Sequence, residues 1–345
     1  MCSPASTGGY RAGRAVLWQV DRWLIHDRAA STLHLVGIEG DEWTNEMSSF
    51  LDSKPELILK KLDPVIAVED EVSSHTDQQH AEIVRRVQSA ITSGQLYQLN
   101  FGRTWGGELS QSPWELMRRL ARDNPAPFSA WLHCQDLGLA LCSSSPELLL
   151  SSDSGVLITR PIKGTRPRGE NPSAEAELRL ELLSDEKELA EHTMLVDLGR
   201  NDIGKVCDYG TVHVNKLMEV KKFSHVQHMV THVIGKLNKN YDMYDAFKAV
   251  FPAGTVSGAP KVRAMEIIDE LEPESRGPYA GAVGYFSFNG CCDFAIAIRS
   301  IFADNEGGFV QAGAGIVFDS IPDNELKETE HKANAMITAL MEASK

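Results

Sequence analysis

Apolar residues recur at helical spacing along most of the chain. Apolar positions three or four residues apart predict helices that bury one face against a core. The pattern predicts helices over residues 41–60, 80–93, 113–124, 174–196, 241–250, 260–271 and 324–343.

Shorter apolar runs, rich in branched and aromatic residues, predict strands between these helices. They cover residues 15–20, 32–38, 97–103, 129–134, 139–143, 148–151, 279–288, 294–302 and 309–312. The strands come in groups and the helices are segregated from them. This order favours an α+β protein built on antiparallel sheet.

No internal repeat and no long Pro/Gly/Ser-rich linker interrupts the pattern, so we expect a single domain over residues 14–345. Residues 1–13 are rich in Ser, Gly and Ala, which predicts a poorly ordered leader. No apolar run approaches the roughly 20 residues of a membrane helix, and the start lacks a basic stretch leading into an apolar one. We therefore expect a cytoplasmic protein that is not bound to a membrane.

The formal net charge of -14 disfavours nucleic acid as a partner, because a phosphate backbone would be repelled. An anionic ligand would need a site that concentrates Arg, Lys, a metal or backbone N–H groups. The six cysteines include no CxxC pair, which favours free thiols in a reducing compartment and argues against a zinc site.

Three segments carry ionisable residues in patterns that merit attention. Residues 161–169 read PIKGTRPRG, and a lysine on such a turn can be desolvated and become a nucleophile, although by itself Lys163 is more typical of a solvated surface lysine. Glu191, in the acidic segment 185–202, lies beside an apolar turn, so this segment is either a solvated helix or a metal site. Glu325 and Glu328 share a helix face and either decorate the surface or hold Mg²⁺.

Two glycine-rich segments complete the set. Residues 251–261 read FPAGTVSGAPK and lead into a helix whose first N–H groups face an anion, but the segment lacks the Gly-Lys-Ser/Thr ending of a Walker loop. Residues 311–317 read QAGAGIV, in which two glycines permit either close approach of a ligand or a bend in a strand.

Taken in this order, the segments resemble the chorismate-binding domain shared by anthranilate synthase component I, aminodeoxychorismate synthase component I, isochorismate synthase and salicylate synthase. The resemblance runs from about Asp77 to residue 345. It implies a single domain of two antiparallel sheets flanked by helices, with Mg²⁺ holding a substrate carboxylate between Glu191 and Glu328, and with Glu325 nearby. Residues 14–60 are at most a shortened N-terminal portion, so feedback inhibition by tryptophan is not expected.

The resemblance also implies roles for other residues. Glu147, in Ser145-Pro146-Glu147, would be the general acid for the departing C4 hydroxyl. Arg299 and Tyr279 would bind the pyruvyl carboxylate, and His228 and Thr255 would line the ring pocket. The expected substrate-binding residues are Arg299, Tyr279, His228, Thr255, Gly164, Thr165, Gly313, Ala314, Gly315, Lys332 and Gln98.

Within the family, few residues separate the activities. Water-adding members carry a lysine where Gln98 stands, which argues against isochorismate or salicylate synthesis. Lys163 gives the PIKGT form typical of aminodeoxychorismate synthases, in which the lysine is the nucleophile, and residues 126–130 also resemble that branch. Residues 254–257, by contrast, are closer to the anthranilate form.

We therefore expect an aminodeoxychorismate synthase component I that takes ammonia from a separate glutamine amidotransferase subunit. Two alternatives remain open. Anthranilate synthase would release pyruvate and would not need Lys163. A non-catalytic, chorismate-binding regulatory relative would have no need for Glu147, Lys163, Glu191, Arg299 and Glu328 together.

Overall fold

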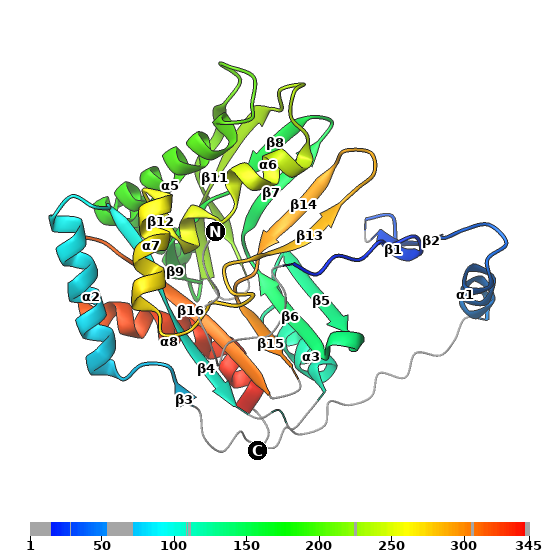
Figure 1. Cartoon of the computed structure of the whole chain (residues 1–345), viewed down its shortest axis with the longest axis horizontal. Helices are drawn as coiled ribbons and strands as arrows, with labels where there is room; N and C mark the ends of the chain where they lie inside the picture. The colour runs from blue at the N-terminus through cyan, green and yellow to red at the C-terminus, as the bar shows by residue number, and fades with distance from the viewer. Residues whose placement is uncertain are drawn as a thin grey trace. The chain divides into compact units, whose positions relative to one another are not determined.

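The apolar runs assemble into two seven-stranded sheets in the computed structural model of the chain (Figure 1). The structure describes residues 15–27, 29–53, 72–107, 109, 112–223, 226–304 and 307–341. The predicted leader, residues 1–13, lies outside these ranges. The chain divides into two compact units. One consists of Ala12–Asp63 and the other of Met1–Arg11 with Pro64–Lys345. The single domain expected over residues 14–345 stays a prediction.

The smaller unit contains a hairpin and a helix. Strands β1 (Trp23–Asp27) and β2 (Thr32–Val36) pair antiparallel, and α1 covers Glu42–Asp52. Asp41 caps α1 by accepting a hydrogen bond from the Thr44 N–H, and Arg22 Nε lies 2.8 Å from Asp41 Oδ2. A shared aspartate thus ties the segment before the hairpin to the start of the helix.

In the larger unit, the first sheet has the strand order β10-β11-β8-β7-β14-β13, and β9 also pairs with β11. Its strands are β7 (Leu148–Asp153), β8 (Val156–Thr159), β9 (Ile162–Pro167), β10 (His213–Lys222), β11 (Val226–Lys236), β13 (Ala282–Phe286) and β14 (Cys292–Ile296). Every pairing in this sheet is antiparallel.

The second sheet has the order β12-β4-β16-β15-β6-β5, and β3 pairs with β4. Its strands are β3 (Val72–Ser73), β4 (Gln98–Gly107), β5 (Phe128–Cys134), β6 (Leu139–Ser145), β12 (Gly258–Ala259), β15 (Ser300–Ala303) and β16 (Gly308–Ile316). These strands also pair antiparallel throughout. The predicted α+β fold with two antiparallel sheets is confirmed.

Helices flank both sheets (Figure 1). They are α2 (Asp77–Thr92), α3 (Pro113–Asp123), α4 (Pro172–Ser184), α5 (Glu186–Gly204), α6 (Met243–Val250), α7 (Lys261–Leu271) and α8 (Pro322–Met341), with short 3₁₀ helices η1 (Gln135–Leu137) and η2 (Gly254–Val256). Among the described residues, no helix is long and apolar enough to span a bilayer.

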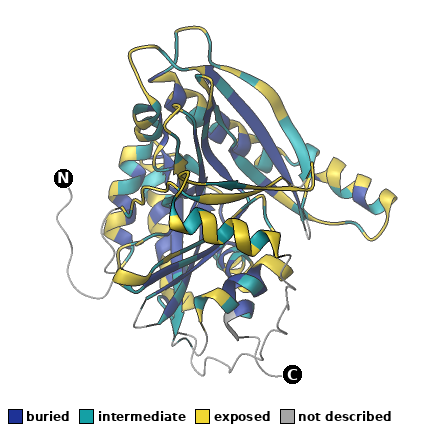
Figure 2. Cartoon of the chain, turned by 90° about the vertical axis from the view of Figure 1, so that its right-hand side faces the viewer, coloured by how far each residue is buried: buried dark blue, intermediate teal, exposed yellow. Residues whose placement is uncertain are grey.

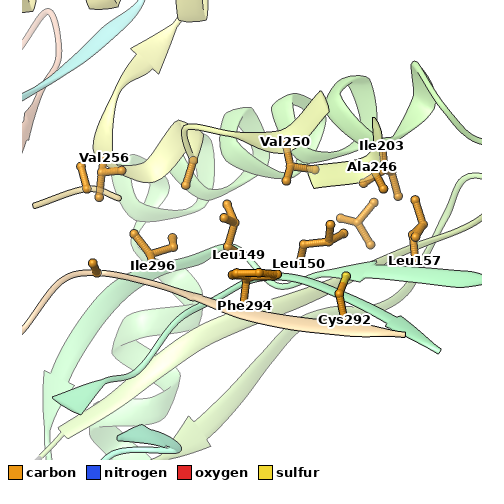
Figure 3. Close-up of a cluster of buried hydrophobic side chains, with 14 of the residues drawn as sticks. Leu149, Leu150, Leu157, Ile203, Ala246, Val250, Val256, Cys292, Phe294 and Ile296 are labelled. Atoms are coloured by element: carbon orange, nitrogen blue, oxygen red, sulfur yellow. The ribbon is translucent and has the colours of Figure 1, made fainter. Parts of the chain in front are cut away.

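Three buried apolar clusters hold the sheets and helices together, and Figure 2 shows buried strands behind helices whose outer faces are exposed. In the largest, Leu149 and Leu150 of β7 and Phe294 of β14 pack toward Ala246 and Val250 of α6 (Figure 3). Leu149 and Leu150 are consecutive, and both reach this cluster where the pairing of β7 with β14 has a register shift. The other two clusters join the second sheet to α3 and α8, and to α2 and α7.

Several predicted elements differ from the structure. Residues 15–20 form no strand. The helix predicted over 174–196 is two helices, because the Asp185 side chain caps α5 by accepting from the Glu188 N–H and Asp185 itself is extended. The strand predicted over 294–302 is interrupted after β14, since Arg299 has a φ of 52°. The helix predicted over 41–60 ends at Asp52, and residues 54–60 lie outside the described ranges. Strands β8 to β11 had no prediction.

Candidate functional site

A bulge in β9 determines where Lys163 points. Thr165 is paired with His228 and Lys163 with Met229, so Gly164 is an extra residue without a partner across the ladder. Gly164 has a φ of 80°, and a Cβ there would lie 2.9 Å from Leu182 Cδ1 and from Met229 Cε. Only glycine combines this backbone conformation with this space. The lysine next to it turns toward α5.

The Lys163 ammonium meets carboxylates from two helices. Its Nζ lies 2.7 Å from Glu191 Oε2 on α5, and the two side chains are 19% and 7% exposed. Burial alone would lower the pKa of Lys163, but Glu191 and Glu328 raise it. The structure therefore holds Lys163 as a cation between the two predicted metal ligands.

The remaining carboxylates of this cluster behave differently from one another. Burial would raise the pKa of Glu328, but Lys332 and Lys163 lower it to about 2. Burial raises the pKa of Glu325, and it also raises the pKa of Glu188, which Lys163 partly offsets. Glu188 had no predicted role, although it lies in the segment 185–202 that the sequence singled out.

Two of these carboxylates retain buried oxygen atoms without hydrogen bonds, namely Oε2 of Glu188 and Oε2 of Glu325. Among the described residues, no three His, Cys, Asp or Glu side chains form a ready-made metal cage. Mg²⁺ is usually held by one or two carboxylates together with substrate and water oxygens. Glu191 and Glu328, which both act on one ammonium, fit that requirement.

Glu147 is the predicted acid, and the structure buries it just before β7 with 5% exposure. Its Oε1 accepts a hydrogen bond of 3.4 Å from the Ile162 N–H. Burial raises the pKa of Glu147 to about 8, with Thr255 opposing the shift. Glu147 and Thr255 line one cavity between α5 and β7. A carboxyl that stays protonated at neutral pH is suited to donate a proton.

The glycines of β16 lie opposite β4 and bring other predicted residues together. Gly313 is paired with Gly102 and Gly315 with Asn100. A Cβ on Gly313 would press on Asn100 Oδ1 and lie 2.8 Å from the Tyr279 hydroxyl. A Cβ on Gly315 would press on Gln98 Nε2 and lie 3.6 Å from Lys163 Nζ. Ala314 lies between these glycines and is buried.

Positive charge also gathers beside the carboxylates. Lys332 Nζ lies 2.6 Å from Glu328 Oε1 and donates to the Gly313 carbonyl over 2.8 Å. Arg299 Nη1 donates to the Lys332 carbonyl over 2.7 Å, and burial lowers the pKa of Arg299. Burial raises the pKa of Tyr279 to about 12, so this phenol remains a hydrogen-bond donor. These groups concentrate positive charge and a hydrogen-bond donor, which an anionic ligand would require in an acidic chain.

His228 lies on β11, and its Nδ1 is 2.9 Å from Thr165 Oγ1 and 3.2 Å from the Gly164 carbonyl. Burial lowers the pKa of His228 to about 4, so the ring is neutral at physiological pH. The structure thus relates Thr165 and Gly164 to His228 through hydrogen bonds. The roles expected for all of these residues stay predictions.

Sequence reasoning missed a partly buried ion pair beside the site. Arg276 Nη2 lies 2.7 Å from Glu272 Oε1, and the side chains are 16% and 5% exposed. Arg276 also donates to the carbonyls of Val256 and Asn100, and Glu272 Oε1 accepts from the Gly102 N–H over 2.9 Å. Glu and Arg four residues apart are typical of an exposed pair, so the sequence carried no signal of burial.

Comparisons with known proteins identify the family of the chain. The family described as chorismate binding enzyme matches residues 10–338. Anthranilate synthase component 1 of Acetivibrio thermocellus is 47% identical over 260 residues, covering 75% of this chain and 52% of that protein. Aminodeoxychorismate synthase component 1 of Bacillus subtilis is 46% identical over 265 residues, covering 77% of this chain and 56% of that protein. The chain thus spans about half the length of these relatives.

A solved structure is also similar. Anthranilate synthase component I from Streptococcus pneumoniae superposes with a TM-score of 0.82 at 36% identity, covering 92% of this chain and 72% of that chain. Relatives with either of two products are thus about equally similar to the chain, and overall identity does not separate the two activities. Since the family match covers nearly the whole chain, the chain belongs to the chorismate binding enzymes.

Proposed function

We propose that the protein is an aminodeoxychorismate synthase component I, which converts chorismate and ammonia to 4-amino-4-deoxychorismate and water. The observation that supports this most is Lys163 at the bulge of β9. Its ammonium lies among Glu191, Glu328 and the Gly315 backbone, where a nucleophile would meet a ring bound by the β16 glycines. Glu147, with its pKa raised to about 8, would act as the acid.

The proposed reaction has two balanced steps. The Lys163 ammonium, once released from Glu191, gives one proton to water and takes one back after turnover. The resulting amine forms a bond to ring C2 while the ring double bonds shift. The C4–O bond breaks, and Glu147 gives its proton to the departing hydroxyl, which leaves as water. Ammonia then forms a bond to C4, the double bonds shift back, the C2–Nζ bond breaks, and the surplus proton returns to Glu147.

Glu191 and Glu328 would hold Mg²⁺, and Glu325 would support them. When bound, Mg²⁺ would supply positive charge for a substrate carboxylate. Arg299, Tyr279, Lys332 and the N–H groups around Ala314 would bind the other carboxylate. Neutral His228 and Thr255 would contact the ring without adding charge.

Anthranilate synthase is the second candidate, in which amination is followed by loss of pyruvate. The residues 254–257 favour it, and so do the names of most of the similar relatives. The third candidate, a non-catalytic binding relative, leaves unexplained why a carboxyl poised for proton donation and a lysine near metal ligands are both present.

The deciding experiment incubates the protein with chorismate, Mg²⁺ and ammonium, and follows product mass and pyruvate together for wild type and Lys163→Ala. Our proposal requires a non-aromatic aminated product without pyruvate, and a loss of activity of about a hundredfold or more in the variant. Anthranilate with stoichiometric pyruvate, formed equally by the variant, would assign the protein to the second candidate. No turnover with either protein would favour the third.

The source of ammonia is a separate proposal. The relatives are named as component 1, which implies a second component, and we propose a glutamine amidotransferase subunit as the partner. Glutamine should replace ammonium in the assay only when the amidotransferase from the same source is added. Equal use of glutamine by the chain alone would contradict this.

A further inference from the structure

The acidic cluster of the candidate site already contains a cation supplied by the chain. Lys163 Nζ is 2.7 Å from Glu191 Oε2, and Glu328 and Glu188 also act on it electrostatically. Glu191 comes from α5 and Glu328 from α8, so the lysine stands between two helices that are far apart in sequence.

The other lysines near the cluster make no comparably short contact with Glu191 among the described residues. Lys332 is engaged with Glu328 and the Gly313 carbonyl at 2.6 and 2.8 Å. Lys187 lies on the same helix as Glu191, is 45% exposed, and keeps its Nζ 3.9 Å from Glu191 Oε1. Among the described lysines, Lys163 makes the short contact with Glu191, at 2.7 Å, and acts electrostatically on Glu328 as well.

We propose that the Lys163 ammonium occupies the cation position of the Glu191–Glu328 site, so that a divalent metal binds tightly only when Lys163 has moved away from Glu191. The reason is competition for the same carboxylate oxygens, since two cations a few ångströms apart in a partly buried site repel one another. The inference rests on the proposed function in one respect, namely that these two carboxylates are the metal ligands.

This competition couples the metal to the nucleophile. Whatever draws Lys163 toward the substrate ring strengthens metal binding, and by linkage a bound metal favours the released lysine by the same factor. Lys163 thereby becomes a determinant of metal affinity in addition to its proposed role as nucleophile. Binding can be measured without turnover, which separates the two roles.

The experiment measures Mn²⁺ binding to the full chain without chorismate, from the electron paramagnetic resonance signal of free Mn²⁺. Wild type is compared with Lys163→Met and Lys163→Gln, which remove the ammonium, and with Lys163→Arg, which keeps a cation. Lys187→Met is the matched control, because it removes a neighbouring lysine that only approaches Glu191. Glu191→Gln removes the proposed ligand. Circular dichroism checks that each variant is folded. If either Lys163→Met or Lys163→Gln does not fold, the other still tests the prediction.

We expect Lys163→Met and Lys163→Gln to bind Mn²⁺ about tenfold or more tightly than wild type, whereas Lys163→Arg and Lys187→Met change affinity by about twofold or less. Equal affinity in wild type and the uncharged Lys163 variants, with binding lost in Glu191→Gln, would overturn the competition and leave the metal site intact. An equal gain in Lys187→Met would reduce the effect to general charge and would also overturn it. Absence of binding in every protein would overturn both the inference and the proposed metal site.

Discussion

At the scale of single residues, Glu147 is a buried carboxyl whose pKa differs between the folded and the unfolded state. It is 5% exposed, and burial raises its pKa to about 8. An ordinary glutamate in the unfolded chain releases its proton near pH 4.5, whereas the folded protein keeps this proton to about pH 8. Between these values the folded state binds more protons than the unfolded state, so rising pH removes stability.

We predict that Glu147→Gln abolishes activity and stabilises the protein at alkaline pH. The unfolding free energy of wild type relative to the variant should fall steadily between pH 4.5 and 8 and then level off, by a few kcal/mol in all, since one pKa unit corresponds to about 1.4 kcal/mol. Urea unfolding at several pH values measures this. Glu274→Gln, at an exposed position, is the control for replacing a surface carboxyl. A constant difference for Glu147→Gln would show that Glu147 is not held protonated.

The same acid should appear in the kinetics. If protonated Glu147 donates to the departing hydroxyl, the slope of log kcat/KM against pH for the wild type should decrease by about one as the pH rises through about 8, whatever rise the deprotonation of Lys163 contributes. A pH profile that stays flat from pH 7 to 9 would assign the proton to another group.

Gly315 offers a test of the space beside Lys163. An alanine methyl there would press on Gln98 Nε2 and lie 3.6 Å from Lys163 Nζ, whereas a methyl on Gly106 in the neighbouring strand would meet its nearest atoms at 3.6 Å. We predict that Gly315→Ala lowers kcat/KM by about tenfold to a hundredfold, as misplacement of reacting groups does, with little change in thermal unfolding. Gly106→Ala should behave as wild type. Unchanged kinetics in Gly315→Ala would place the substrate elsewhere.

At the scale of elements, Arg276 and Glu272 join segments that carry site residues. The guanidinium donates to Val256 in η2 and to Asn100 in β4, while Glu272 accepts from Gly102 in β4. The guanidinium also lies 5.6 Å from the Tyr279 ring centroid. One ion pair therefore links the loop of Thr255, the strand of Gln98 and the residue predicted to bind the pyruvyl carboxylate.

We predict that Arg276→Met destabilises the protein by roughly 3–5 kcal/mol, because it leaves the Glu272 carboxylate buried without its partner. The double variant Arg276→Met with Glu272→Met should recover part of this loss, since both charges are then removed. Urea unfolding of the two single variants and the double variant measures the coupling. A double variant that is as unstable as the sum of the singles would show that the pair is not coupled.

The elements also show how far the sequence alone can predict this protein. Apolar periodicity predicted most of the helices. The candidate site residues were predicted from motifs that resemble those of a known family. Apolar periodicity did not predict β10 and β11, because their alternation is irregular and β10 has two register shifts. The break between α4 and α5 and the turn at Arg299 depend on a single capping side chain and a single φ angle. The pairing of Lys163 with Glu191 depends on a bulge in β9, and this bulge cannot be predicted unless the partner strand is known.

At the scale of the whole molecule, the larger unit carries the three buried clusters. All the residues assigned to these clusters lie between Ile83 and Ala339. We predict that a shortened chain of residues 64–345 unfolds cooperatively. Its far-ultraviolet circular dichroism spectrum should show that its sheets and helices are formed. It should also bind Mn²⁺ with the affinity of the full chain. Loss of cooperative unfolding in the shortened chain would show that residues 12–63 contribute to the core.

The pairing of β4 has a consequence for the synthesis of the protein on the ribosome. β4 lies against β16 along most of its length, with Leu99 opposite Ile316 and Gly107 opposite Gly308. At a synthesis rate of about 5–20 residues per second, on the order of 10 to 40 s separate the emergence of these two strands from the ribosome. During that interval one edge of β4 has unpaired N–H and C=O groups that invite pairing with another chain. We therefore expect slower translation before residue 308 to lengthen the time for which this edge of β4 is open to pairing with another chain.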